Sequence, residues 1–169
     1  MKQVIKNRYL KVFRFSFVEE ASTFFKNQKA ERSLSIEDTL GDSYYCYVCY
    51  HSLTKEKQFV LSFSSDESED NLNFLFWENI FVLDTGTNIY LIDESLNIKT
   101  SLETTTPLAG LYLISNDKLL ILEEAYLRII NYNGDIVRAE LFGLIEDFSI
   151  KDNLLSIQTS EENRVIELT

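Results

Sequence analysis

The chain has 169 residues, of which 45% are hydrophobic, so intrinsic disorder is excluded as the default and a substantial core is expected. It contains 27 Asp and Glu residues against 16 Lys and Arg residues, which gives a formal net charge of −11. A strongly acidic chain repels nucleic acid and anionic membranes, so neither is predicted as a partner, and basic partners or cations are favoured. The same acidity also serves solubility alone, and both roles stay open at this point.

The charge is distributed unevenly along the chain. Residues 1–32 carry a net charge of +5, so residues 33–169 carry −16. No apolar run approaches the roughly 20 residues that a membrane-spanning helix needs. Lys11 and Arg14 interrupt the apolar residues of the first 18 positions, so no secretory signal is predicted. With two cysteines and no export signal, we expect free thiols and a cytoplasmic protein.

The N-terminal part is predicted to combine a strand with a short helix. Residues 8–18 alternate with period two, which predicts a strand with one buried aromatic face. That face carries Tyr9, Lys11, Phe13, Phe15 and Phe17. Residues 19–29 are mostly good helix formers, so a helix is expected next. A second helical turn is expected from Ser35, with Asp38 completing its cap and Gly41 ending it.

Two aromatic-rich segments then predict a β-hairpin. They are residues 43–52 and 58–63, joined through the polar run Thr54–Lys57. The acidic loop of residues 64–71 follows the hairpin. We expect this loop to separate an N-terminal part (1–70) from a region of repeats (71–169) within a single domain of residues 1–169.

Residues 71–169 repeat one pattern of short strands and turns. Ile89 corresponds to Leu127 and Ile98 to Ile136, a period of 38 residues. The matching segments are Ile80–Leu83 with Leu119–Leu122, Asn88–Ile92 with Tyr126–Ile130, and the turns Asp93–Asn97 with Asn131–Asp135. A third copy is predicted from Phe148–Ile150, Leu154–Ile157 and Arg164–Leu168.

These copies, about 2.75 in number, resemble the four-stranded blades of β-propellers, although neither a WD nor a kelch signature occurs. The resemblance implies an all-β, mainly antiparallel fold, a meander of propeller-blade-like repeats with a short helix near the N-terminus. Because a closed propeller needs at least about four blades, we expect an open or truncated arrangement. A β-sandwich with evenly spaced hairpins is the alternative.

The segment Cys46-Tyr-Val-Cys49-Tyr-His51 contains the residue types that bind zinc. On a strand, however, Cys46 and Cys49 face opposite sides, and no second Cys or His pair completes a tetrahedral site. Half-buried structural cysteines are therefore expected. His51 is the only histidine, and no nucleophile motif accompanies it. We predict no catalytic residue, no metal and no cofactor, with a small hydrolase using paired carboxylates as an alternative.

A small, acidic chain without catalytic motifs resembles the immunity proteins of bacterial toxin–immunity pairs. The resemblance rests on size, charge and missing motifs, and it implies a non-catalytic inhibitor that masks the active site of a basic, nuclease-like toxin. A protein-interaction module of an unrelated assembly is the alternative, as a monomer or, through an exposed sheet edge, a dimer. Predicted loops would supply the contacts. The candidate partner-binding residues are Asp66, Glu67, Glu69, Asp70, Glu123, Glu124, Glu161 and Glu162.

Overall fold

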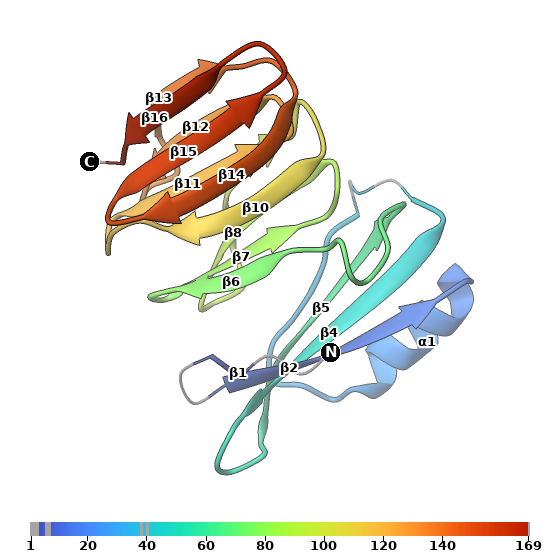
Figure 1. Ribbon diagram of the computed structural model, residues 1–169. Coiled ribbons are helices and arrows are strands. Elements are labelled where there is room, and N and C mark those ends of the chain that lie inside the picture. The colour runs from blue at the N-terminus through green and yellow to red at the C-terminus, as the bar shows by residue number, and fades with distance from the viewer. Residues whose placement is uncertain (1–3, 6–7, 38, 40, 169) are drawn as a thin grey trace. The chain divides into compact units, whose positions relative to one another are not determined.

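The computed structural model describes residues 4–5, 8–37, 39 and 41–168. The chain forms two compact units, Met1–Glu103 and Thr104–Thr169, which we call unit 1 and unit 2. The described residues form one helix and sixteen strands, and the strands lie in four separate sheets, two in each unit (Figure 1).

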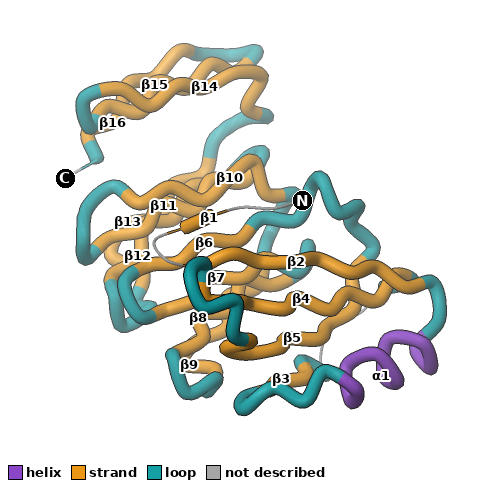
Figure 2. The backbone as a smooth tube through the Cα atoms, turned by 90° about the horizontal axis from the view of Figure 1, so that it is seen from below, coloured by secondary structure: helices purple, strands orange, loops and turns teal. Residues whose placement is uncertain are grey.

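Unit 1 begins with a five-stranded sheet in the order β1-β2-β4-β5-β3 (Figure 2). Its neighbouring strands are antiparallel, except that β3 runs parallel to β5. The pair β4–β5, with Tyr47 opposite Leu61, confirms the predicted hairpin. The elements are β1 (Val4–Ile5), β2 (Arg8–Phe15), α1 (Val18–Asn27), β3 (Ser33–Ser35), β4 (Ser43–His51) and β5 (Lys57–Ser65).

Strand β2 ends earlier than predicted, and its aromatic face is not the more deeply buried one. Leu10, on the opposite face, is 1% exposed and belongs to the main core. On the aromatic face, the rings of Phe13 and Phe15 pack on Phe24 of α1, at centroid distances of 4.5 and 5.1 Å. Phe17 lies beyond the strand and is 62% exposed. The period-two pattern therefore predicted the strand correctly, but not a single buried face, because the core covers one face of β2 and helix α1 covers the other.

Helix α1 confirms the predicted helix and lies against β2, β4 and β5. Its buried residue, Ala21, allows a close approach to the sheet. Glu19 and Glu20 stand in the first turn and Lys26 in the last, which is the distribution that the helix dipole favours.

The helical turn predicted from Ser35 is wrong. Ser35 ends β3, and the Ile36 N–H donates to the carbonyl oxygen of Ser62 at 2.8 Å, which extends the pairing along β5. Pairing with β5 satisfies the backbone groups that a helical turn would otherwise satisfy. Asp38, the expected capping partner, lies outside the described residues.

The second sheet of unit 1 is an antiparallel meander that packs against the first. Phe76, Phe81 and Leu83 from this sheet share one core with Tyr47 and Leu61 from the hairpin. Its strands are β6 (Phe74–Trp77), β7 (Ile80–Asp84), β8 (Asn88–Asp93) and β9 (Ile98–Glu103).

Unit 2 consists of a four-stranded and a three-stranded antiparallel meander. Their shared core includes Leu120, Leu127 and Ile129 from the first sheet and Leu155 and Ile157 from the second. The strands are β10 (Leu108–Leu113), β11 (Lys118–Glu123), β12 (Tyr126–Asn131), β13 (Ile136–Leu141), β14 (Ile145–Lys151), β15 (Leu154–Thr159) and β16 (Asn163–Glu167).

These meanders confirm the predicted fold class. Strands β7, β8 and β9 recur 38 positions later as β11, β12 and β13, and the third copy forms β14–β16. The strands divide among four sheets, whereas the sandwich alternative requires two facing ones. No helix among the described residues is long and apolar enough to cross a membrane.

Candidate functional site

Three connections of unit 2 meet at one end of its sheets. The β11–β12 turn contains Glu124, and its carbonyl oxygen accepts the Ile145 N–H at 2.7 Å, where β14 begins. Ile145 in turn pairs with Thr159, where β15 enters the β15–β16 turn. We call these three connections the acidic turns, because their exposed side chains include five carboxylates. These are Glu124, Glu146, Asp147, Glu161 and Glu162.

Glu123, beside Glu124, has the opposite orientation. Its side chain is fully buried and forms an ion pair with the guanidinium of Arg128, which is 6% exposed. One oxygen of the Glu123 carboxylate also accepts the N–H groups of Thr105 and Thr106, at 2.5 and 2.8 Å. A carboxylate that is 0% exposed belongs to no binding surface, so Glu123 holds the acidic turns and does not face a partner.

Backbone hydrogen bonds fix the β11–β12 turn further. The N–H of Glu124 donates to the carbonyl oxygen of Pro107 at 2.8 Å, and the N–H of Phe142 donates to that of Ala125 at 2.9 Å. Together with the bond from Ile145, these contacts tie the turn to strands on both sides. The backbone that carries Glu124 is therefore held in place before any partner arrives.

Thr159 fixes the β15–β16 turn in a similar way. Its N–H and its hydroxyl both donate to the carbonyl oxygen of Glu162, at 2.9 and 3.1 Å. The same hydroxyl oxygen accepts the N–H groups of Glu161 and Glu162, at 3.2 and 3.0 Å. Thr159 is 6% exposed, whereas both glutamates that it holds are exposed.

The two lysines of unit 2 lie at the other end of its sheets. Lys118 begins β11 and Glu123 ends it, so the two ends of this strand are about 17 Å apart. Lys151 ends β14, whose first residues belong to the acidic turns. Asp117, Asp135 and Asp152 lie at the same end as these lysines, so the five exposed carboxylates of the acidic turns are the larger concentration of negative charge.

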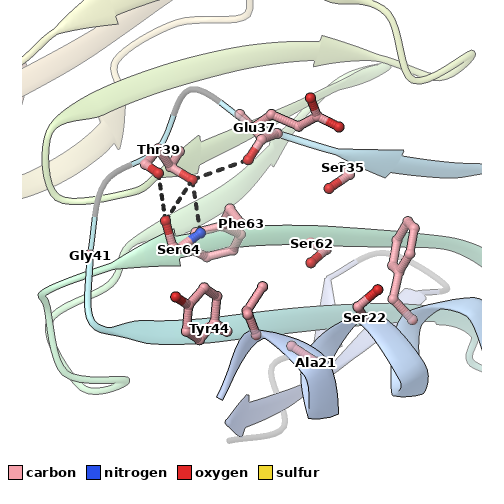
Figure 3. Close-up of a pocket in the computed structure, with 13 residues that line it drawn as sticks. Ala21, Ser22, Ser35, Glu37, Thr39, Gly41, Tyr44, Ser62, Phe63 and Ser64 are labelled. Atoms are coloured by element: carbon pink, nitrogen blue, oxygen red, sulfur yellow. Dashed lines mark hydrogen bonds between the residues drawn. The ribbon is translucent and has the colours of Figure 1, made fainter. Parts of the chain in front are cut away.

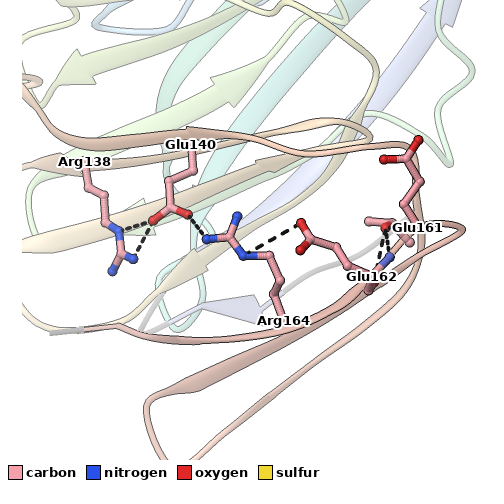
Figure 4. Close-up of polar contacts among 6 residues, drawn as sticks. Arg138, Glu140, Glu161, Glu162 and Arg164 are labelled. Atoms are coloured by element: carbon pink, nitrogen blue, oxygen red, sulfur yellow. Dashed lines mark hydrogen bonds and ion pairs between the residues drawn. The ribbon is translucent and has the colours of Figure 1, made fainter.

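A row of alternating charges runs from β13 to the β15–β16 turn (Figure 4). Glu140 accepts from Arg138 at 2.7 Å and from Arg164 at 3.2 Å, and Arg164 also lies 3.9 Å from Glu162. The guanidinium of Arg164 lies 5.0 Å from the ring centroid of Phe142. Half-exposed ion pairs of this kind contribute little to stability singly, but here they join the two sheets of unit 2.

The other four predicted residues lie in unit 1, on the β5–β6 loop. Asp66 is exposed and accepts the Asp42 N–H at 2.8 Å, and the half-buried Glu67 accepts from the Asn71 side chain at 3.0 Å. Glu67 also touches the β7–β8 turn, because a Cβ placed on Gly86 would lie 2.7 Å from its Cγ. This loop therefore stands beside the turn of unit 1 that corresponds to β11–β12 in unit 2.

Glu69 and Asp70 line one small cavity together with Tyr47 and Asn73. Its volume is about 150 Å³, below the roughly 300–1,000 Å³ typical of ligand pockets. Paired carboxylates for sugar hydrolysis need room for a sugar ring between them, so this cavity gives the hydrolase alternative no support.

A larger cavity of about 480 Å³ lies between α1, the end of β3 with the segment after it, and β5 (Figure 3). The hydroxyls of Ser22, Ser35 and Ser62 point into it from these three elements, and Glu37 is its charged lining residue. The hydroxyl of Thr39 donates to the Ile36 carbonyl oxygen at 3.1 Å, which shapes one end of the cavity. No pair of acidic groups lines it among the described residues.

The cysteines are more buried than predicted. Cys46 and Cys49 are free thiols, each 0% exposed, and they lie on opposite faces of β4 as the spacing predicts. Burial raises the pKa of the Cys46 thiol and raises that of Cys49 to about 12, so both are poor nucleophiles at neutral pH. His51 accepts the Thr54 N–H through Nδ1 at 3.2 Å, a structural contact within the hairpin turn. Among residues 4–5, 8–37, 39 and 41–168, no group of three or more Cys, His, Asp or Glu side chains is arranged to hold a metal ion.

Sequence reasoning missed Glu146 and Asp147, which complete the acidic turns. The repeat itself carried the signal, since the connection into the first strand of a sheet lies at the same end as the turn between its second and third strands. Applied to residues 142–147, that rule places both carboxylates at the end of the sheet that carries the β15–β16 turn with Glu161 and Glu162.

Comparisons with solved structures give β-propeller-like proteins. BamB from Moraxella catarrhalis is 12% identical and matches 81% of this chain and 49% of its own, with a TM-score of 0.57. BBS1N, in a complex with ARL6DN, is 9% identical and matches 75% of this chain and 47% of its own, with a TM-score of 0.55. The sequence matches no protein-family model and no curated protein. This chain thus spans about half the length of both neighbours, and the likeness establishes a propeller-like fold.

Proposed function

We propose that this chain is a non-enzymatic protein-binding module that engages a basic partner through the acidic turns of unit 2. The observation that carries the proposal is that buried residues of these turns fix the backbone, whereas neighbouring exposed residues present carboxylates to solvent. Buried Glu123 and Thr159 fix the backbone, while Glu124, Glu161 and Glu162 project from it into solvent. Preorganised side chains lose little conformational freedom on binding, which favours recognition.

The charge distribution supports a basic partner. Residues 104–169 contain eleven Asp and Glu residues against five Lys and Arg residues. Arg128 is buried against Glu123, and the two lysines lie at the far end. Arg164 lies beside Glu162 and Glu140, but the five exposed carboxylates of the acidic turns outnumber it, so the field there is negative. Such a field accelerates encounter with a cation-bearing surface and selects against acidic ones.

The structural neighbours are compatible with this role. BBS1N was solved in a complex with ARL6DN, which supports a protein partner for this chain. Immunity toward a basic, nuclease-like toxin is one specific form of the proposal. Its support remains the profile of size and charge, and neither the structure nor the neighbours add to it.

Charge reversal with a matched control tests the proposal. The variant Glu124→Lys/Glu161→Lys changes two exposed acidic-turn residues, and Asp117→Lys/Asp152→Lys makes the same charge change at the opposite end. Each immobilised protein is exposed to lysate of the source organism at low salt, and bound proteins are identified and quantified. We expect a basic protein that binds wild type and the control, and whose binding to the acidic-turn variant falls about tenfold.

Two results contradict the proposal. Equal losses in both variants would show that net charge alone, and no particular surface, attracts the bound protein. Unchanged binding by the acidic-turn variant would show that the partner contacts another part of the molecule. Circular dichroism of all three proteins verifies that the substitutions leave the fold intact.

A further inference from the structure

Two leucines are exposed at the end of unit 2 that carries the acidic turns. Leu141 ends β13 and is 72% exposed, and Leu144, which directly precedes β14, is 61% exposed. The sheet β14–β16 follows both residues in the chain and shares a core with the sheet β10–β13, yet it leaves both side chains in solvent. Exposed apolar side chains that lie together on a polar surface mark a candidate contact with a partner.

Backbone contacts place Leu144 between two of the acidic turns. The N–H of Ile145 donates to the carbonyl oxygen of Glu124 at 2.7 Å, and Ile145 also pairs with Thr159, which holds the β15–β16 turn. On the other side of Leu144, a Cβ placed on Gly143 would lie 3.7 Å from the Cβ of Thr159. Both chain neighbours of Leu144 are therefore held against the turns that carry the carboxylates.

Leu141 lies beside the β11–β12 turn. It pairs with Tyr126, the first residue of β12 after that turn. The next N–H along the chain, that of Phe142, donates to the carbonyl oxygen of Ala125 at 2.9 Å. The segment from Leu141 to Leu144 therefore runs alongside the turn that contains Glu124.

The preceding repeat shows that the fold requires leucine at neither position. Leu141 pairs with Tyr126 at the start of the third strand β12, and Glu103 pairs at the start of the third strand β8. Leu144 directly precedes β14, as Pro107 directly precedes β10. Glu103 and Pro107 are also exposed, so packing of the sheets does not account for the two leucines.

From these observations we propose that the acidic turns bind a short segment of a partner protein in which apolar side chains are flanked by lysine or arginine. Leu141 and Leu144 contact the apolar side chains, and the carboxylates of Glu124, Glu161 and Glu162 pair with the flanking cations. An apolar centre that loses its water on binding, inside a charged rim that stays partly hydrated, is the usual arrangement of an energetically important contact. A segment of lysines and arginines alone would leave both leucines in water.

The inference rests on the proposed function, because it names the kind of basic partner that the acidic turns bind. It adds a requirement that charge alone does not make. Charge reversal at Glu124 and Glu161 tests the acidic surface, whereas replacement of Leu141 and Leu144 tests the apolar contact.

The probes are two synthetic peptides of equal charge, Gly-Lys-Arg-Leu-Leu-Arg-Lys-Gly and the same peptide with serine in place of both leucines. Their affinities for the full chain are measured by NMR titration. The test variant is Leu141→Ser/Leu144→Ser. The matched control is Ile136→Ser/Val137→Ser, which changes two residues that begin the same strand and are 49% and 52% exposed. The NMR spectrum of each free variant verifies its fold.

We expect the wild-type chain to bind the leucine peptide about tenfold more tightly than the serine peptide. This difference should disappear in Leu141→Ser/Leu144→Ser and remain in the control. The serine peptide should bind the wild-type chain and both of these variants equally. Glu124→Lys/Glu161→Lys should weaken the binding of both peptides, because it removes the charge attraction that they share.

Three results would overturn the inference. If the wild-type chain binds both peptides equally while charge reversal weakens both, the acidic turns are a site for charge alone. If the preference for the leucine peptide survives in Leu141→Ser/Leu144→Ser, or falls as much in the control, the apolar contact lies elsewhere on the chain. If neither peptide binds, the surface does not recognise such a segment, and the proposed function is still decided by the lysate experiment.

Discussion

Removal of the Glu123 carboxylate should destabilise unit 2 more than any single change among the exposed acidic residues. In Glu123→Ala, the N–H groups of Thr105 and Thr106 lose their acceptor, and Arg128 remains as a buried cation without its carboxylate. Breaking a buried pair by deleting one member typically costs about 3–5 kcal/mol. Glu124→Ala, one residue away and exposed, should change the free energy of unfolding by less than about 0.5 kcal/mol.

A double-mutant cycle separates the ion pair from the other contacts of Glu123. Arg128→Met removes the cation but leaves the carboxylate with two backbone donors, so its cost is expected at about 2–3 kcal/mol. The other single variant of the cycle is Glu123→Gln, which keeps an acceptor for those donors but leaves Arg128 without a counter-charge. The double variant Glu123→Gln/Arg128→Met keeps the acceptor and removes both charges. Its cost should be smaller than the sum of the single changes, by about 2 kcal/mol.

The measurement must report on unit 2. Trp77 lies in unit 1, so its fluorescence is the wrong probe, and native-state hydrogen exchange at the core residues Leu120 and Ile129 is the right one. Urea unfolding followed by circular dichroism gives the companion value for the whole chain. A loss below about 1 kcal/mol in Glu123→Ala, or additive costs in the cycle, would refute the assignment of Glu123 as the anchor of the acidic turns.

Two further predictions concern the β7–β8 turn of unit 1. Burial raises the pKa of Asp84 above its ordinary value of 3.8, so its contribution to stability is full below that value and is lost as pH rises through the raised pKa. Asp84→Asn should therefore cost less at pH 7 than near pH 4 in urea unfolding, and a cost that grows with pH would contradict this sign. Gly86 has φ +88°, and a Cβ there would lie 2.7 Å from Glu67, so Gly86→Ala should cost about 1–2 kcal/mol. Gly143→Ala, whose Cβ would meet Thr159 at an ordinary 3.7 Å, is the control and should stay within about 0.5 kcal/mol in thermal unfolding.

The repeats were predictable because their signals are local. Each turn between a third and a fourth strand is closed by its own hydrogen bonds: Asn97 donates to the Asp93 carboxylate in one sheet, and Asn131 and Asp135 bond to each other in the next. The first turn has aspartate at its first position and asparagine at its last, the second turn has the reverse, and both are closed by bonds between these two residues. Side chains that close a turn with their own neighbours can be recognised in sequence without knowledge of the rest of the fold.

The site was predictable in part. The acidic-turn positions Glu124, Glu161 and Glu162 were identified as loop residues, but Glu123 was grouped with them because adjacent glutamates look alike in sequence. Arg128, a single cation within the otherwise apolar segment Leu127–Ile130 of β12, is the residue that would have distinguished Glu123 from Glu124. A cation on a buried strand requires a carboxylate nearby, and residue 123 is five positions away across a short turn. The Ser35 turn failed for a different reason, since pairing with residues 27 positions later in the chain determines that segment.

In all three repeats, a buried residue at the end of the second strand fixes the turn to the third strand, although its residue type differs. Glu123 and Thr159 end the second strands of their sheets, and Thr85 directly follows β7, the second strand of its sheet; each is at most 6% exposed. The two threonines close their turns through a shared scheme, N–H and hydroxyl to the carbonyl oxygen three residues on. Glu123 has a longer reach and bonds instead to the preceding connection at Thr105 and Thr106. In unit 2 a buried side chain fixes each of these turns, and the exposed tips carry carboxylates. Stability and recognition are thus assigned to neighbouring residues of the same turn, which is why the two can be tested by separate substitutions.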